Sequence, residues 1–401
     1  MTTECRICAG PVEEFLDLGR QPLSDAFRRP DDTRPEFFYR LAVGVCGTCS
    51  MVQLVEEVPR ERMFHEDYPY VSRGSAVMRE HFRGVAERFI AIADDPFVVE
   101  LGCNDGTMLR TVAEAGVRHL GVEPSGGVAD LAAADGVRVR KDFFEEATAR
   151  DIRAADGPAD VIYAANTLCH IPYMGSILRG VDALLAPDGV FVFEDPYLGD
   201  IVEKTSFDQI YDEHFFLFSA RSVDEMARRH GLELVDVERL AVHGGEVRYW
   251  LARPGVRPRT AAVDALLAEE AELASRVVLD GFANRVQKIR ADLVALLTDL
   301  RERGERVVGY GATAKSATVT NLCGIGPDLV EFICDTTPAK QHRLAPGSGI
   351  PVRPPADFAD PYPPYALLFA WNHAEEIMAK ERAFRDAGGK WITYVPEVRV
   401  L

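Results

Sequence analysis

Short apolar runs alternate with amphipathic helical stretches along most of the chain. FVVEL (97–101) is apolar at nearly every position and leads into the glycine turn GCNDG and the start of a helix. HLGVEPS, VRVRKDFF, ADVIYAANTL and GVFVFEDPY repeat this pattern, with helical stretches between them. The alternation predicts a doubly wound parallel sheet. GLELVDVERL and GEVRYWLAR follow without a long helix between them, so we expect an antiparallel pair at the edge of that sheet.

A second unit of the same kind occupies the C-terminal part. RPGVRPRT (253–260) interrupts the first pattern, and residues 261–304 then carry apolar side chains at helical spacing. Their length is compatible with a coiled coil, but a connecting helix or helical pair packed on a neighbouring domain is the simpler interpretation. RVVGYGATAKS begins a new strand–turn–helix unit, and LVEFICD, YALLFAW and WITYV are its later strands. The sequence therefore predicts an α/β protein with two such units in tandem.

Composition narrows the classes of function. The chain has 401 residues, of which 47% are hydrophobic and 27% charged, as in soluble globular proteins. Its net charge of −18 disfavours general binding of nucleic acid or anionic membranes, but a small anionic substrate can be held by local donors. No apolar run reaches the roughly 18 residues of a membrane span, and the N-terminus has no apolar signal core. We therefore expect a cytoplasmic protein of two to four domains.

Four of the eight cysteines form two CxxC pairs near the N-terminus. Each pair places two thiolates on one tight turn, and two pairs supply the tetrahedral sulfur set that suits Zn²⁺. The long interval between the pairs requires a small subdomain to fill it. A redox-active CxxC is the main alternative, but it predicts a single motif beside a βαβ unit. We predict a structural zinc site with the ligands Cys5, Cys8, Cys46 and Cys49.

The first glycine turn is a candidate nucleotide site. It lacks the G-x-G-x-x-G fingerprint, which argues against NAD in this unit. Glu100 before the turn can face an amine-bearing ligand, and Glu123 at the next strand end can accept ribose hydroxyls. Asp142 and Phe143 can meet an adenine. S-adenosylmethionine (SAM) needs all three features, whereas one such acid alone would be an ordinary strand-end residue. The candidate cofactor residues are Glu100, Gly102, Asn104, Gly106, Glu123, Asp142, Phe143 and Asn166.

A polar cluster follows the fifth strand. The aromatic stretch FDQIYDEHFFLFS holds Tyr211, Glu213 and His214 on a loop at the carboxyl edge of the sheet, where such folds bind ligands. His170, in NTLCH, follows the fourth strand and is expected to face the same crevice. A histidine beside a glutamate offers a base near neutral pH, and a tyrosine can donate to an oxyanion. A lone histidine would more often be structural, but this combination favours a catalytic site.

The second glycine turn suits an anionic ligand. Backbone N–H groups at Gly311, followed by Lys315 on a helix, are suited to a diphosphate. NAD is the alternative ligand, and it is disfavoured because no acid follows a second strand in the usual way, Asp335 being the nearest candidate. WNH (371–373) follows a later strand and is a candidate either for ligand contacts or for packing. The candidate residues of this unit are Gly311, Ala312, Lys315, Ser316, Trp371, Asn372 and His373.

These motifs together carry a resemblance that covers the whole chain. The paired CxxC knuckles, YPYVSRGS, ELGCNDG, NTLCH, YDEHFFLFS, GYGATAKS and AWNHAEEI have the order and spacing of the three-domain nucleotide-sugar C-methyltransferases of antibiotic deoxysugar pathways, which this chain resembles. The resemblance implies a small zinc domain (1–72) and a central class I (Rossmann-like) methyltransferase domain that uses SAM (73–255). Connecting helices and a Rossmann-like nucleotide-sugar-binding domain would follow (256–401).

The resemblance also implies a substrate, a dTDP-linked keto-deoxysugar held between the last two domains. Tyr68, Tyr70 and Ser72 would belong to a mobile lid near substrate and cofactor. The residues around the reacting carbon would be Tyr211, Glu213, His214 and His170. The motifs leave the methylated ring carbon open, because relatives methylate different ones.

A mechanism follows from the acidity of the sugar. A sugar C–H is acidic only next to a ketone, so a base must remove an α-proton to give an enolate. His214 is the expected base, with Glu213 orienting it or sharing the task, and His170 or Tyr211 would hold the keto oxygen. A sugar O- or N-methyltransferase and a non-catalytic nucleotide-sugar-binding scaffold are the alternatives. We expect a monomer, because three domains with their own cleft need no partner.

Overall fold

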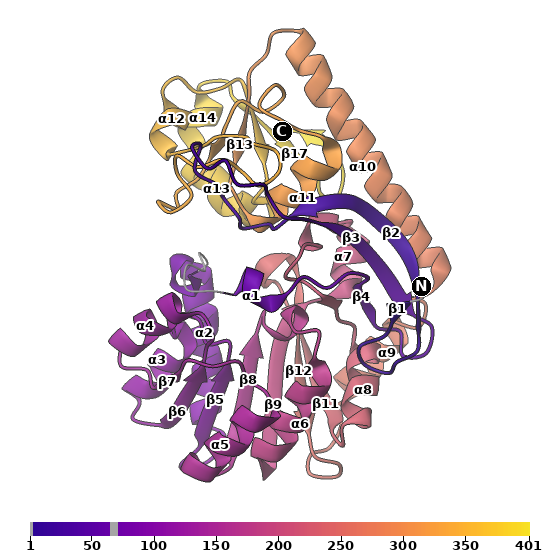
Figure 1. Cartoon of the computed structure of the whole chain (residues 1–401), viewed down its shortest axis with the longest axis vertical. Helices are drawn as coiled ribbons and strands as arrows, with labels where there is room; N and C mark the ends of the chain where they lie inside the picture. Colours follow the sequence, from indigo (N-terminus) through magenta and orange to yellow (C-terminus); the bar gives the residue numbers. More distant parts are fainter. Residues whose placement is uncertain (1–2, 65–70) are drawn as a thin grey trace.

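The structure is a computed structural model that describes residues 3–64 and 71–401, and three β-sheets succeed one another within them (Figure 1). The N-terminal sheet is antiparallel, with the order β1-β2-β3-β4-β10. Its N-terminal elements are β1 (Thr3–Glu4), β2 (Pro11–Pro22), β3 (Phe38–Cys46), β4 (Val52–Leu54) and the short helix α1 (Arg60–Met63). Its last strand, β10 (Phe216–Leu217), directly follows the polar cluster at 211–214. The zinc domain and the candidate catalytic loop are therefore joined through one sheet.

The central sheet has the order β7-β6-β5-β8-β9-β12-β11. Its strands are β5 (Phe97–Leu101), β6 (Arg118–Val122), β7 (Val139–Arg140), β8 (Ala159–Ala165), β9 (Leu185–Pro196), β11 (Glu233–Leu240) and β12 (Glu246–Ala252). β5 to β9 are mutually parallel, whereas β12 runs antiparallel to β9 and to β11. The expected antiparallel pair at the edge is thus confirmed. The strand order reverses at β5 and β8, which is where open α/β sheets bind ligands.

Helices cover both faces of the central sheet because its strands are apolar on both sides. Val98 and Tyr163 belong to the core under α2 (Ala76–Ile90), α3 (Thr107–Glu114) and α4 (Gly126–Ala134). Val99 and Ile162 face the opposite core, under α5 (Glu146–Asp156), α6 (Met174–Leu184) and α8 (Ala220–Arg229). The short helix α7 (Leu198–Lys204) follows β9. The helices on the two faces hold the central strands in place, so that the carboxyl ends of the parallel strands lie along one edge of the sheet.

The C-terminal sheet has the order β15-β14-β13-β16-β17-β18 and is parallel except for β18. Its strands are β13 (Val307–Tyr310), β14 (Ile333–Cys334), β15 (Val352–Arg353), β16 (Tyr365–Leu368), β17 (Lys390–Thr393) and β18 (Arg399–Val400). Its helices are α11 (Ala314–Cys323), α12 (Pro355–Ala359), α13 (Ala374–Lys380) and α14 (Arg382–Asp386). The second α/β unit is therefore confirmed.

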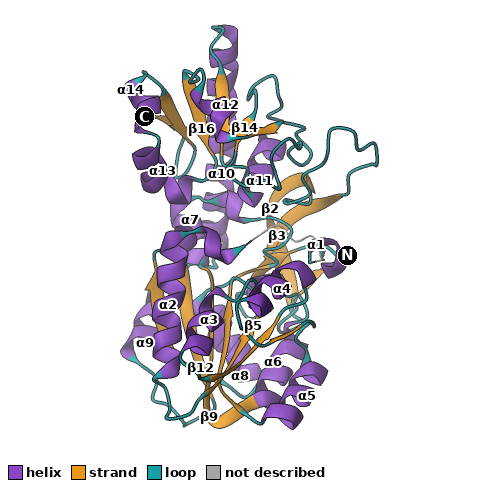
Figure 2. Ribbon diagram, turned by 90° about the vertical axis from the view of Figure 1, so that its left-hand side faces the viewer, coloured by secondary structure: helices purple, strands orange, loops and turns teal. Residues whose placement is uncertain are grey.

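Two helices connect the α/β units, α9 (Ala261–Glu269) and the long α10 (Arg276–Glu302). α10 buries a stripe of side chains that includes Leu279, Phe282 and Val286, and it packs against β2 and α11 of its own chain. A connecting helix, and not a coiled coil, is the observed use of this stretch. Figures 1 and 2 both place β2 and β3 between the central and C-terminal domains.

The segment between β2 and β3, residues 23–37, contacts the C-terminal domain. Arg28 forms a β-bridge with Leu344, and Lys340 Nζ lies 3.0 Å from Asp25 Oδ1. The N–H of Gly347 donates to Glu36 Oε1 at 3.0 Å. These contacts let the small N-terminal domain hold both α/β domains around a common space.

Candidate active site

A cavity of about 650 Å³ lies where the three domains meet. Its walls include Arg60 from the N-terminal domain, Glu123 and His214 from the central domain, and Lys315 from the C-terminal domain. All four candidate catalytic residues line it, namely His170, Tyr211, Glu213 and His214. The cavity also reaches both glycine turns, so one space joins the candidate cofactor and substrate sites.

The turn after β5 is shaped to admit a nucleotide. Gly102 has φ = +66°, and a Cβ there would lie 2.5 Å from Thr167 Oγ1, so both backbone and space require glycine. Glu123 holds the turn, since its Oε2 accepts the N–H of Asn104 at 3.0 Å and its Oε1 accepts the N–H of Ser125 at 2.8 Å. Burial raises the pKa of Glu123, and the two N–H donors oppose that effect. Gly102, Asn104, Glu123, Phe143 and Asn166 all line the cavity.

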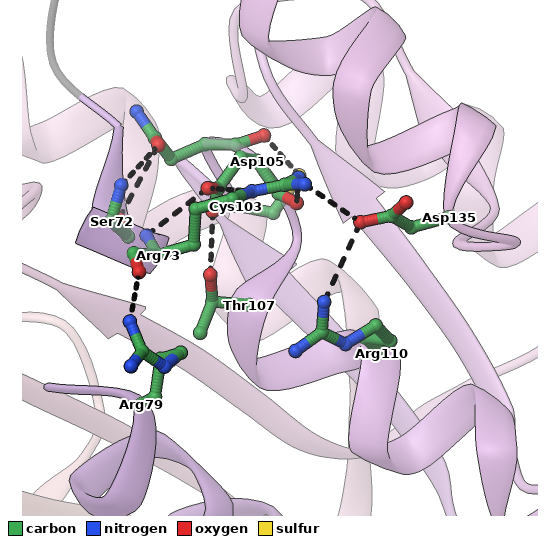
Figure 3. Close-up of polar contacts among 9 residues, drawn as sticks. Ser72, Arg73, Arg79, Cys103, Asp105, Thr107, Arg110 and Asp135 are labelled. Carbon is green, nitrogen blue, oxygen red and sulfur yellow. Dashed lines mark hydrogen bonds and ion pairs between the residues drawn. The ribbon is translucent and has the colours of Figure 1, made fainter. Parts of the chain in front are cut away.

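The segment that begins at residue 71 is hydrogen-bonded to this turn (Figure 3). The N–H and hydroxyl of Ser72 donate to Asn104 Oδ1 at 3.1 and 3.3 Å. Arg73 Nε lies 2.6 Å from Asp105 Oδ2, and Arg73 Nη1 lies 3.0 Å from Asp135. Ser72 therefore lies beside the turn after β5 and lines the cavity. Tyr68 and Tyr70, the other candidates of the expected lid, lie outside the described residues.

Three candidate cofactor residues do not line the cavity. Gly106 is the N-cap residue of α3, and its left-handed backbone conformation (φ = +71°) lets the helix begin there. Asp142 Oδ2 is paired with Arg140 at 2.9 Å. Glu100 is buried behind the turn, and its Oε2 has no hydrogen-bond partner among the described residues. Burial, followed by the neighbouring acids Asp105, Glu123 and Glu194, raises the pKa of Glu100 well above its usual value and so favours its neutral form.

Tyr211 and His214 form a hydrogen-bonded pair in the cavity wall. His214 Nδ1 lies 2.7 Å from the carbonyl oxygen of Gln209, which can only accept, so Nδ1 carries the proton. His214 Nε2 is then the acceptor, and the Tyr211 hydroxyl donates to it at 2.7 Å. Burial, with the nearby His170 as a smaller cause, holds the pKa of His214 well below its usual value. The pair is therefore a neutral imidazole base in contact with a phenol.

His170 presents an unused ring nitrogen beside this pair. Its ring stacks on that of His214, with centroids 5.3 Å apart, and its Nε2 has no hydrogen-bond partner among the described residues. Burial lowers the pKa of His170 to about 3, so the ring is neutral. The ring can therefore donate a hydrogen bond to a substrate oxygen without carrying a charge.

His170, His214 and Cys169 also have ligand atoms within 4.8 Å of one another. The two imidazoles are nearly parallel, with an interplanar angle of 22°, so their in-plane lone pairs do not converge on one ion. Both nitrogens of His214 are already engaged. We therefore assign no metal to this cluster.

The turn after β13 carries positive charge. Gly311 has φ = +90°, and a Cβ there would lie 2.9 Å from that of Ala370. Lys315, in the first turn of α11, lines the cavity, and its Nζ lies 3.3 Å from Asn372 Oδ1. Burial lowers the pKa of Lys315. Ala312, Asn372 and His373 line the cavity as well.

Other candidates of this domain have structural contacts. The indole N–H of Trp371 donates to Asp208 Oδ2 at 2.6 Å, and the Ser316 hydroxyl donates to the carbonyl of Thr313 at 2.6 Å. These two residues and Gly311 do not line the cavity. The expectation that no acid follows the second strand was wrong. Asp335 follows β14 directly, and its Oδ2 accepts the N–H of Ala312 at 2.7 Å.

Several residues that line the cavity were not predicted from the sequence. His243 lies between β11 and β12 with φ = +51°, and burial lowers its pKa to about 3. The two glycines that follow it were a signal of an unusual turn. Arg60 and Lys340 are single charged residues in ordinary surroundings, so their sequence gave no signal of their approach to the cavity.

The four N-terminal cysteines form a compact cluster. Cys5 Sγ lies 3.5 Å from Cys49 Sγ, and Cys8 Sγ lies 3.4 Å from Cys46 Sγ, so each contact joins one knuckle to the other. Tetrahedral Zn²⁺ with bonds of about 2.3 Å needs sulfurs about 3.8 Å apart, which these positions approach. The N–H groups of Ile7, Gly10 and Thr48 point at three of the sulfurs. The hydrogen bond from Cys49 is the largest of the effects that lower the pKa of Cys5 to about 5, so the cluster favours a thiolate.

Known protein families match three successive segments of the chain. Three family models match in succession, a zinc binding domain over residues 5–64, a methyltransferase domain over 76–237 and a C-methyltransferase C-terminal domain over 241–396. C-methyltransferase NovU of Streptomyces niveus is 35% identical over 411 residues, which cover 99% of this chain and 96% of NovU. The ubiquinone biosynthesis O-methyltransferase of Azorhizobium caulinodans is 28% identical over 97 residues, covering 24% of this chain and 38% of that protein.

Fold and site together define a SAM-dependent methyltransferase with a zinc-binding N-terminal domain and a class I central domain. More particularly, the chain belongs to the C-methyltransferase family that includes NovU, as the match over nearly its full length shows. The predicted fold class and the predicted SAM and zinc are confirmed. A magnesium protoporphyrin IX methyltransferase from Synechocystis with bound SAM matches 44% of this chain and 79% of its own, at 10% identity and a TM-score of 0.34. Within the described residues, no helix is long and apolar enough to cross a membrane.

Proposed function

We propose that this protein transfers the methyl group of SAM to a ring carbon of a dTDP-linked keto-deoxysugar, after removal of an α-proton. The proposal rests on the Tyr211–His214 pair. This pair lines the same cavity as the turn after β5, where SAM is expected, and Lys315, which follows the turn after β13. Methyl transfer to carbon requires a base, because a sugar C–H is not nucleophilic. A buried, neutral imidazole whose Nε2 accepts a hydrogen bond from a phenol is suited to that task.

The charge of the second turn supports a diphosphate-bearing acceptor. Lys315 lines the cavity at the start of α11, and Lys340 lines it nearby. In a chain with a net charge of −18, cations placed inside one cavity attract an anion that the surface as a whole repels. The nucleotide would lie against these lysines, and the sugar would extend toward Tyr211 and His170.

The proposed reaction divides the work among three side chains. The α-proton moves to Tyr211 Oη while the Tyr211 proton moves to His214 Nε2, and the C–H electron pair becomes the enolate. The Gln209 carbonyl accepts from Nδ1 and so stabilises the imidazolium that forms. The unpartnered Nε2 of His170 donates to the keto oxygen as negative charge develops there. Gly102, Asn104 and Glu123 would hold SAM, which would supply an electrophilic sulfonium methyl group for the enolate carbon.

Hydrogen exchange and methylation together test this proposal. In D2O with a dTDP-3-keto-6-deoxyhexose, the native protein should exchange the α-hydrogen, and with SAM it should add a methyl group on carbon, located by NMR. His214→Asn should lose both reactions by about 10²–10⁴-fold. The control His230→Asn replaces a histidine at the end of α8, outside the cavity, and should retain both.

Each alternative result has a distinct meaning. Full exchange in His214→Asn would remove His214 and its relay from the mechanism. A methyl group found on oxygen or nitrogen, without exchange, would make the protein an O- or N-methyltransferase. Binding of both ligands without reaction, by the native protein with several keto sugars, would favour a non-catalytic role.

A further inference from the structure

Arg60 connects the zinc domain to one end of the cavity. It belongs to α1, yet its guanidinium carbon lies 4.2 Å from the centre of the Phe143 ring and 4.7 Å from that of Tyr173, both in the central domain. Its Nη1 donates to Glu145 Oε1 at 2.8 Å. Arg60, Phe143 and Tyr173 all line the cavity. An N-terminal side chain is thus fixed by stacking and by an ion pair on the surface of the methyltransferase domain.

The position of Arg60 corresponds to the adenine end of the SAM site. Glu123, the candidate ribose acceptor, follows β6, and Phe143 follows β7, the strand next to β6 and farther from the catalytic pair. A base attached to a ribose at Glu123 would extend toward Phe143. Asp142, the acid expected to meet adenine, instead pairs with Arg140 and does not line the cavity. Phe143 and Tyr173, with the planar cation of Arg60 stacked on them, are among the side chains that line the cavity.

We propose that Arg60 forms a wall of the adenine pocket, so that the zinc domain supplies part of the SAM site. A guanidinium is planar and weakly hydrated, and it stacks on π systems in a way that the ammonium of lysine does not. Glu145 orients the guanidinium and balances its charge, so the adenine end accepts a cationic cofactor without added repulsion. Arg60 would act through stacking on the base, away from the reacting methyl group.

Arg62 provides a matched control on the same helix. Its guanidinium also stacks on an aromatic ring, that of Phe37 at 4.4 Å, but Arg62 does not line the cavity. Zinc-loaded Arg60→Met should bind SAM about tenfold more weakly by isothermal titration, whereas Arg62→Met should stay within about twofold of the native protein. Arg60→Lys keeps the charge without the plane and should recover only part of the loss.

A second ligand separates adenine stacking from other causes. 5′-Methylthioadenosine keeps adenine and ribose but lacks the amino-acid group, so Arg60→Met should weaken it by the same factor as SAM. A loss confined to SAM, or an equal loss in Arg62→Met, would overturn the proposal, as would native affinity in Arg60→Met. If Arg60→Met does not fold, judged by Tm and zinc content, the comparison of Arg60→Lys with Arg62→Lys decides. These titrations need no sugar, so their outcome is independent of the proposed acceptor.

Discussion

The glycine turn of the central domain and that of the C-terminal domain are built from the same backbone parts. In each, a buried parallel strand leads into a glycine with positive φ, +66° at Gly102 and +90° at Gly311, and a helix follows. In each, an acid at the end of the neighbouring strand holds the turn. Glu123 accepts the N–H of Asn104 at 3.0 Å, and Asp335 accepts that of Ala312 at 2.7 Å. Both turns open onto one cavity.

Acidic side chains surround the first turn, whereas lysines lie beside Asp335 at the second. Glu100, Asp105 and Glu123 surround the first, whereas Lys315 lies on the helix after the second and Lys340 Nζ donates to the carbonyl of Ala312 at 3.0 Å. SAM carries a sulfonium, and the proposed co-substrate carries a diphosphate. The same strand–glycine–helix backbone can therefore approach either ligand closely and offer it N–H donors. The nearby side chains determine whether a cationic or an anionic ligand is favoured.

The largest effect should come from removing the cation of the second turn. Lys315→Met leaves the proposed diphosphate without its buried partner, so the affinity for dTDP should fall by about a hundredfold. The affinity for SAM should stay within about twofold, as measured by titration calorimetry. Lys288→Met, which removes an exposed lysine of α10, is the control. Equal losses for both ligands would indicate damage to the shared cavity instead of sorting by charge.

The converse variant, Glu123→Gln, should weaken SAM and spare dTDP. An amide replaces an oxygen that accepts both a backbone N–H and, by our proposal, a ribose hydroxyl, so the affinity for SAM should fall by about tenfold. Glu114→Gln, at an exposed position at the end of α3, controls for the general change of charge. If Glu123→Gln and Glu114→Gln bind SAM alike, the ribose role of Glu123 is wrong.

Much of this architecture was predictable because parallel strands buried on both faces leave unbroken apolar runs. FVVEL and GVFVFEDPY are such runs, and both form strands of the central sheet. β14 is only two residues long; the sequence placed it within LVEFICD and named Asp335 as the nearest candidate acid, but did not predict its hydrogen bond with Ala312. Patterns of buried positions predict elements well where the elements are long.

The site was predictable only as far as it lies at strand ends. His170 follows β8 closely, and the order of the strands implies its position, whereas Tyr211 and His214 lie beyond α7 on the stretch from β9 to β10. Asp142 was placed at the adenine on the same reasoning, but Arg140, two residues earlier, engages its carboxylate. The approach of Arg60 depends on how two domains pack, and no local pattern encodes that. The sequence therefore predicts which edge binds ligands better than it predicts which side chains reach them.

A smaller effect should appear in the pH dependence of binding. Burial lowers the pKa of Lys315, so its cation is lost at a pH below the usual range for lysine. Because dTDP binds the protonated form, its affinity should fall as pH rises through that pKa, by at most about tenfold per unit. 5′-Methylthioadenosine, which has no group that titrates in this range, should bind evenly from pH 7 to pH 10. An unchanged slope in Lys315→Met would assign the titration to another group.

The smallest effect is expected at Glu100, although it lies closest to the first turn in sequence. Its raised pKa favours the neutral acid, so Glu100→Gln replaces that form by another neutral group of similar shape, and the affinity for SAM should stay within about twofold. The raised pKa of Glu100 should also change how the stability of the protein depends on pH. The folded state holds a proton that the unfolded state releases above about pH 4.5, so native Glu100 loses its contribution as pH rises, and Glu100→Gln should raise Tm more at pH 8 than at pH 5. A tenfold loss of SAM affinity with no gain in Tm would show an ionised Glu100 that faces the cofactor's ammonium group. The acidity of the first turn would then act through Glu100 as well as Glu123.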